Sequence, residues 1–187
     1  MKVLTLDRRS FEESCRRLGA LVVNSDFTPD LIVGIRRGGE YVAWGLHACF
    51  PHASLVSVSL QRPSTHKKHY LGSFLRFFPQ WILDMMRIVE ARWLARHPKR
   101  ACDMEPVALP VSLQKLGTKR VLLVDDAVDS GVTMYRIVMA LRSENPKIDL
   151  RTAAITVTTD DPIVRPDWAL YNNGILIRFP WSMDARK

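Results

Sequence analysis

The fold of this chain is decided by residues 121–134, which read VLLVDDAVDSGVTM. Four apolar residues run into two adjacent acids, Asp125 and Asp126, and a turn-forming Asp-Ser-Gly precedes a helical pattern. This order predicts a buried strand that ends in a sharp turn before a helix. The backbone N–H groups of such a turn, together with the helix N-terminus, bind anions. The segment therefore predicts a phosphate site beside carboxylates that suit hydroxyl groups or a cation.

A second strand, glycine-rich turn and helix are predicted near the N-terminus. Residues 31–35 form an apolar run, the turn contains Arg36, Arg37, Gly38 and Gly39, and residues 40–49 follow as a helix. Glycine lets the backbone approach an anion closely, and the two arginines add positive charge. Taken alone, this could be an ordinary turn. Together, the two turns suit a substrate that carries phosphate at both ends.

The pattern of residues 121–134 resembles the phosphoribosyl pyrophosphate (PRPP) signature of the type I phosphoribosyltransferases. The resemblance implies that two acids face the ribose hydroxyls and that the following turn wraps the 5-phosphate. The implied ribose and 5-phosphate ligands are Asp125, Asp126, Asp129, Ser130, Gly131, Val132 and Thr133. It also implies that Asp129 lies near the attacking atom of the acceptor, which makes it the candidate catalytic base.

In this family the earlier turn is the pyrophosphate loop, so its implied ligands are Arg36, Arg37, Gly38 and Gly39. The resemblance also implies a cis peptide between Arg36 and Arg37. The implied reaction displaces pyrophosphate from ribose C1 by a nitrogen nucleophile, so that the enzyme acts mainly through positioning and electrostatics. Mg²⁺ is the implied cofactor, because it neutralises the leaving pyrophosphate, and Asp126 is the expected protein contact to this metal.

The C-terminal end resembles xanthine-guanine and hypoxanthine phosphoribosyltransferases, with an apolar strand followed by Pro-Trp. Leu176 occupies the position of an aromatic residue that stacks on the base, and Ile177 is the neighbouring backbone contact. Thr158 stands where the family carries a lysine that holds the purine oxo group. These three residues are the expected acceptor-binding positions. Their identities predict an altered acceptor site, although a purine-type base remains the first expectation.

Residues 61–110 are expected to contain a loop that closes over the site, followed by an insert. Residues 61–70 correspond to a mobile loop of the family, in which His66, Lys67 and Lys68 reach the pyrophosphate, and a solvated loop is the alternative. Residues 71–110 are expected to form a helical insert, because aromatic and aliphatic residues recur at helical spacing. A core helix, a dimer contact and a lid over the acceptor all fit this pattern.

The alternation of strands and helices predicts an α/β fold with a central, mostly parallel sheet flanked by helices. Further strands are expected at residues 3–6, 54–60 and 150–158, and helices at 133–142 and 10–23, the latter capped by Ser10. The 187 residues are expected to form one domain, with a small hood built by the terminal segments, including residues 159–187, and by the insert.

The formal charge of +8 favours anionic partners, which PRPP satisfies. The three scattered cysteines and the polar N-terminus predict reduced thiols in a cytoplasmic protein. We expect a homo-oligomer, a dimer or tetramer, with no nucleic-acid or membrane partner. Two alternatives stay open: a regulator that keeps the sugar-phosphate site and binds RNA or DNA, and phosphoribosyl transfer to a specialised-metabolite precursor.

Overall fold

A computed structural model describes residues 2–60, 107, 109–113, 119–172 and 175–182. The mobile loop expected at residues 61–70 lies outside these residues, and so does nearly all of the insert expected at 71–110. None of the described helices is long and apolar enough to cross a lipid bilayer.

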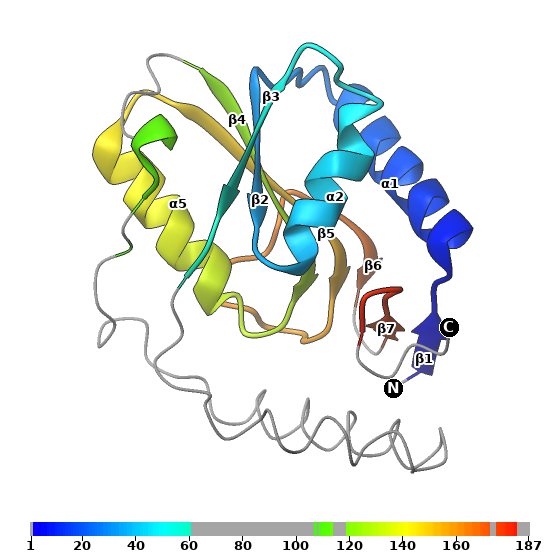
Figure 1. Ribbon diagram of the computed structural model, residues 1–187. Helices are drawn as coiled ribbons and strands as arrows, with labels where there is room; N and C mark the ends of the chain where they lie inside the picture. Colours follow the sequence, from blue (N-terminus) through cyan, green and yellow to red (C-terminus); the bar gives the residue numbers. More distant parts are fainter. Residues whose placement is uncertain (1, 61–106, 108, 114–118, 173–174, 183–187) are drawn as a thin grey trace.

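The described part of the chain forms a five-stranded parallel sheet in the order β3-β2-β4-β5-β6. Its strands are β2 (Leu31–Ile35), β3 (Ser54–Val58), β4 (Arg120–Val128), β5 (Asp149–Val157) and β6 (Trp168–Asn172). Helices α1 (Arg8–Val23) and α2 (Gly38–His47) cover one face of the sheet, and α5 (Val132–Glu144) covers the other (Figure 1). A short 3-10 helix, η3, spans Val111–Leu113. The predicted α/β architecture is confirmed.

The two faces of the sheet bury separate apolar clusters because successive strand residues point to opposite sides. Ile32 and Leu122 pack with the residues of α1 and α2, whereas Val33 and Leu123 pack with those of α5. All four side chains are fully buried. The continuous apolar runs in β2 and β4 thus reflect a sheet covered on both faces.

The hood expected from the terminal segments contains a second, two-stranded sheet. β1 (Lys2–Thr5) pairs in parallel with β7 (Ile175–Arg178), which joins the two ends of the chain. Leu6 N–H extends this pairing by donating to the Arg178 carbonyl at 2.9 Å. The hood lies beside the main sheet, at the end where the site loops emerge (Figure 1).

Helix α1 begins earlier than the sequence predicted. Asp7 is the N-cap, and its Oδ1 accepts the Ser10 N–H at 2.7 Å, so the capping box expected at Ser10 is wrong. Glu13 pairs instead with Arg16. Strand β4 also differs from the expected four residues, because it continues through both acids to Val128.

Helix α1 packs against α2 and the residue that follows its C-cap through two reciprocal glycine–cysteine contacts. A methyl group on Gly45 would lie 2.5 Å from Cys15 Sγ, and one on Gly19 would lie 2.5 Å from Cys49 Sγ. Both thiols are free, as expected, and burial raises the pKa of Cys15 to about 12. Cys15 therefore acts as a small packing residue rather than a reactive group.

Candidate functional site

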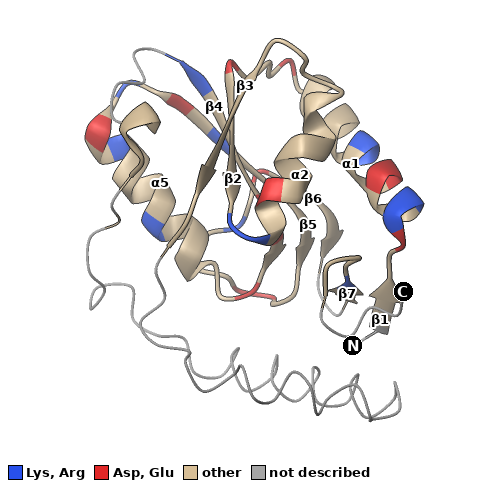
Figure 2. Ribbon diagram, viewed as in Figure 1, with Lys and Arg blue, Asp and Glu red and all other residues tan. Residues whose placement is uncertain are grey.

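The two predicted turns emerge next to each other. β2 and β4 are neighbouring parallel strands in which Gly34 lies opposite Val124, so both strands end at the same edge of the sheet. The turn that follows β2 leads into α2, and the turn that follows β4 leads into α5. Figure 2 shows the basic turn after β2 at this edge. In open α/β sheets, ligands bind outside the carboxyl ends of the strands.

The first turn has the predicted backbone conformation. The Arg36–Arg37 peptide bond is cis, and Gly38 opens α2 with Arg37 as N-cap. Arg36 N–H donates to the Val58 carbonyl at 2.8 Å, while its guanidinium Nε lies 3.3 Å from Glu40 Oε2. The turn is thus anchored to β3 and α2 through Arg36, and the side chain of Arg37 is exposed.

Glycine is required in this turn because the turn touches β4. A methyl group on Gly38 would lie 1.9 Å from Asp126 Oδ2. A methyl group on Gly39 would lie 2.5 Å from the Val124 carbonyl oxygen and 2.9 Å from Asp125 Cα. The turn that the sequence assigned to pyrophosphate and the acids it assigned to ribose are therefore packed against each other.

The paired acids lie within β4 and are half-buried. Asp126 N–H donates to Asp125 Oδ1 at 2.9 Å, and Ala127 N–H donates to Asp126 Oδ1 at 3.0 Å. Burial, followed by the charge of Asp126, raises the pKa of Asp125 well above its usual range. Burial also raises the pKa of Asp126, against hydrogen bonds from Asp125, the Ala127 N–H and Trp181. Such a pair is stabilised by a proton, a cation or hydroxyl donors.

The turn after β4 is shaped by Gly131, which has φ +75° and is the N-cap of α5. A methyl group here would lie 2.8 Å from Val164 N, so the conformation and the space both require glycine. Ile163 N–H donates to the Ser130 carbonyl at 2.9 Å. The segment after β5 therefore supports the turn expected to hold the 5-phosphate.

Asp129 and Thr158, which the sequence associated separately with the acceptor, contact each other. Thr158 Oγ1 donates to Asp129 Oδ1 at 2.6 Å, and Thr158 N–H donates to the Val128 carbonyl at 3.0 Å. The threonine hydroxyl thus fixes one carboxylate oxygen of the exposed Asp129. This contact joins the ends of β4 and β5 and could not be inferred from their separation along the chain.

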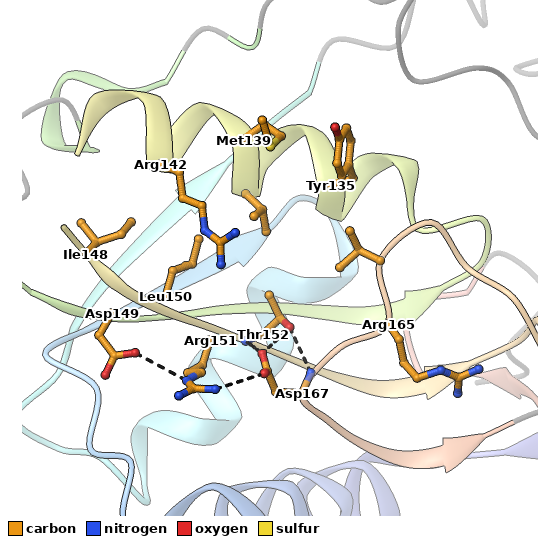
Figure 3. A pocket seen from close by; sticks show the side chains of 12 residues that line it. Tyr135, Met139, Arg142, Ile148, Asp149, Leu150, Arg151, Thr152, Arg165 and Asp167 are labelled. Atoms are coloured by element: carbon orange, nitrogen blue, oxygen red, sulfur yellow. Dashed lines mark hydrogen bonds and ion pairs between the residues drawn. The ribbon is translucent and has the colours of Figure 1, made fainter. Parts of the chain in front are cut away.

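A hollow of about 520 Å³ lies between α5 and β5 and contains none of the predicted site residues (Figure 3). Asp167 Oδ2 accepts hydrogen bonds from Thr152 N (2.7 Å) and Thr152 Oγ1 (2.8 Å). Thr152 Oγ1 also accepts the Asp167 N–H at 3.0 Å, and Arg151 lies 3.5 Å from Asp167. These bonds hold the C-terminal end of the segment that links β5 to β6 and supports Gly131. The lining of the hollow therefore has a structural role, and we call the set of bonds between Thr152 and Asp167 the clamp.

Thr152→Val is expected to loosen this clamp. It leaves Asp167 without the hydroxyl donor and its N–H without an acceptor, so we expect a loss of about 1–3 kcal/mol in unfolding free energy. Because the clamped segment supports the turn at Gly131, ribose 5-phosphate binding should also weaken. Urea unfolding and calorimetry measure the two effects, with the exposed Thr28→Val as control. Unchanged stability would contradict the clamp.

Asp125→Asn is expected to stabilise the ligand-free protein while impairing PRPP binding. Because the native pKa of Asp125 is raised, the folded state holds a proton that the unfolded state releases, so stability falls as pH rises from about 4 through the native pKa. The asparagine removes this penalty. Thermal unfolding at pH 7.5 should show a higher Tm, where about 1 kcal/mol corresponds to roughly 2–4 °C.

The gain from Asp125→Asn should shrink as the pH falls below about 4, where both states are protonated. The exposed Asp161→Asn is the matched control and should show no such dependence on pH. A gain of the same size at both pH values, or a loss at pH 7.5, would contradict the assignment of Asp125 as a group destabilised by ionisation.

The other predicted site residues belong to strand β7 and to the expected mobile loop. Leu176 and Ile177 lie on β7 opposite Val3 and Leu4, with Ile177 buried in the core, and their contact with an acceptor stays a prediction. His66, Lys67 and Lys68 lie outside the described residues. Among the described residues, no group of three or more His, Cys, Asp or Glu side chains could hold a metal ion. Sequence reasoning missed the support that Ile163 and Val164 give to the turn at Gly131, which no local pattern signals.

Comparison with known proteins agrees with this geometry. Residues 80–183, more than half of the chain, match the model of the phosphoribosyl transferase domain, so the chain belongs to this family and is a phosphoribosyltransferase. No curated protein matches the sequence.

Solved structures of low identity share the fold. A purine phosphoribosyltransferase from Pyrococcus horikoshii has a TM-score of 0.62 at 18% identity, covering 97% of this chain and 95% of that chain. The xanthine-guanine-hypoxanthine phosphoribosyltransferase of Helicobacter pylori has 0.63 at 14%, covering 98% and 95%. A hypothetical protein from Neisseria gonorrhoeae with bound ppGpp has 0.61 at 17%, covering 96% and 89%.

Proposed function

We propose that this member of the phosphoribosyl transferase family transfers the 5-phosphoribosyl group from PRPP to a ring nitrogen of a purine-type base and releases pyrophosphate. The observation that carries the proposal is the packing of Gly38 and Gly39 against Asp125 and Asp126. Together with the parallel pairing of β2 and β4, this packing brings both turns and the pair of acids to the same edge of the sheet. This arrangement of two turns on either side of a pair of acids suits a ribose with a phosphate at one end and a pyrophosphate at the other.

In this proposal the turn from Asp129 to Thr133 binds the 5-phosphate, and the turn from Arg36 to Gly39 binds pyrophosphate. Helix N-termini and backbone N–H groups supply the contacts. Asp125 and Asp126 accept hydrogen bonds from the ribose hydroxyls. Asp129 receives a proton from the attacking nitrogen, while Thr158 holds its other oxygen.

Asp126 would contact Mg²⁺. The donor set fits this ion, since Mg²⁺ in phosphate-transfer sites binds one or two carboxylates and completes its shell with substrate oxygens and water. A cluster of three protein ligands is therefore not required. The half-buried acid pair, which is destabilised when both members ionise, also favours a cation nearby. When bound, Mg²⁺ would neutralise charge on the leaving pyrophosphate.

A purine-type acceptor is supported by the fold shared with the Pyrococcus horikoshii and Helicobacter pylori enzymes and by the strand β7 near the site. Leu176, Ile177 and Thr158 are the proposed acceptor-side residues. The neutral Thr158 and the aliphatic Leu176 favour an acceptor that needs neither a cation on its oxo group nor an aromatic stacking partner from β7.

A pyrophosphate-release assay with PRPP and Mg²⁺ across purines, pyrimidines and non-nucleobase amines tests the proposal. We expect release with at least one purine-type base and none without PRPP. Release only with a non-nucleobase amine would contradict a purine-type acceptor, but it would still support PRPP as the donor. Salt-dependent RNA or DNA binding that PRPP modulates, with no release for any acceptor, would favour a regulator instead.

A further inference from the structure

The hydroxyl proton of Thr158 is already bound to Asp129. Thr158 Oγ1 lies 2.6 Å from Asp129 Oδ1, and because a carboxylate only accepts, the hydroxyl is the donor. Hydrogen bonds to a charged acceptor are roughly twice as strong as those between neutral groups. A neutral carbonyl group on a bound base therefore competes poorly with Asp129 for this proton.

The lone pairs of the same oxygen remain available. A hydroxyl oxygen has two of them, and among the residues that the structure describes no donor reaches Thr158 Oγ1. The backbone holds Thr158 in place, because its N–H donates to the Val128 carbonyl at 3.0 Å. Next to Asp129, Thr158 thus presents a hydrogen-bond acceptor and not a donor.

The surroundings of Thr158 are acidic, and the hood lies close to them. Asp160 and Asp161 follow within three residues, and both are exposed. Two residues before Thr158, Thr156 Oγ1 donates to the Ile175 carbonyl of β7 at 3.2 Å. This bond ties the hood strand to the end of β5 that carries Thr158. A base bound there would meet carboxylates and a hydroxyl oxygen, which together favour N–H donors over carbonyl groups.

We infer that Thr158 is a specificity-determining residue, which selects an acceptor base with an amino group rather than an oxo group on the edge that faces it. The inference rests on the function proposed above, in which Asp129 takes the proton of the attacking nitrogen. Thr158 Oγ1 would accept a hydrogen bond from the amino group while its own proton stays on Asp129. An oxo group would instead bring two hydrogen-bond acceptors together with no proton between them.

Pyrophosphate release with PRPP and Mg²⁺ tests this inference through matched pairs of purines. Adenine and hypoxanthine carry an amino or an oxo group at C6, and guanine and xanthine differ in the same way at C2. We expect kcat/KM for the amino member to exceed that for the oxo member about 10-fold or more in at least one pair, because the mismatched base leaves polar groups unpaired. The pair that shows the preference identifies the edge that faces Thr158.

Variants of Thr158 separate specificity from support of Asp129. Thr158→Val removes the hydroxyl but keeps the shape of the side chain. Loss of the bond to Asp129 should slow both members of a pair alike, whereas the amino-over-oxo ratio should fall about 10-fold. Thr158→Ala serves the same purpose if Thr158→Val does not fold, and Thr158→Ser should keep the ratio. Thr159→Val, at the neighbouring half-buried threonine, is the matched control and should change neither activity nor ratio.

The inference and the proposed function fail in different ways. Wild-type protein that releases no pyrophosphate with any purine would overturn the proposed function. Release in which the oxo member of both pairs is used as well as the amino member, or better, would overturn only the amino preference. An amino preference that survives in Thr158→Val or Thr158→Ala would overturn the role of Thr158.

Discussion

Asp129→Asn is expected to remove most of the turnover, about 10²–10⁴-fold, while leaving PRPP bound. Asparagine keeps the shape of the side chain and an oxygen that can accept the Thr158 hydrogen bond, but it cannot take a proton from the acceptor. The 5-phosphate turn should stay intact, because Gly131 and the contact between Ser130 and Ile163 shape it through the backbone.

Single-turnover kinetics and PRPP binding by calorimetry separate the two outcomes for Asp129→Asn. Asp161→Asn, an exposed acid in the neighbouring segment, is the matched control and should retain full activity. Thr158→Val should lower turnover less than Asp129→Asn does, because it frees the carboxylate without removing it, and Thr158→Ser should restore it. Unchanged turnover in Asp129→Asn would exclude a role as base.

Gly39→Ala is expected to damage the fold and the donor site together. The added methyl group would lie 2.5 Å from the Val124 carbonyl oxygen and 2.9 Å from Asp125 Cα. Both atoms belong to the backbone of a strand that is paired on both sides, so α2 must move away from β4. Overpacking of this kind costs about 1–3 kcal/mol. Movement of the turn should also abolish PRPP binding.

Gly45→Ala provides a matched control within the same helix. Its methyl group would lie 2.5 Å from Cys15 Sγ, away from the site, so it should lower stability while the folded fraction still binds PRPP. Urea unfolding and calorimetry on both variants measure the two effects. If Gly39→Ala binds PRPP as tightly as Gly45→Ala does, the contact between the first turn and β4 is not needed for the donor site.

The described fold follows closely from local patterns in the sequence. Apolar runs predicted β2 and the buried half of β4, and the glycine-rich turns marked where helices begin. The main errors came from interactions with neighbouring segments. β4 continues through Asp125 and Asp126 because β5 pairs with its backbone whatever its side chains are, with Asp125 opposite Ala154. β6 was not predicted, since its half-buried residues at the sheet edge show no clear alternation.

Sequence by itself determined the residue types of the donor site and their order: paired acids, two glycine turns, and Asp129 beside a phosphate-type turn. These are local features, since a turn or a helix start depends on residues a few positions apart. Tertiary structure alone decided that Gly38 lies against Asp126 and that Thr158 donates to Asp129. Those contacts join residues 29 and 88 positions apart, and only the packing of neighbouring parallel strands brings them together.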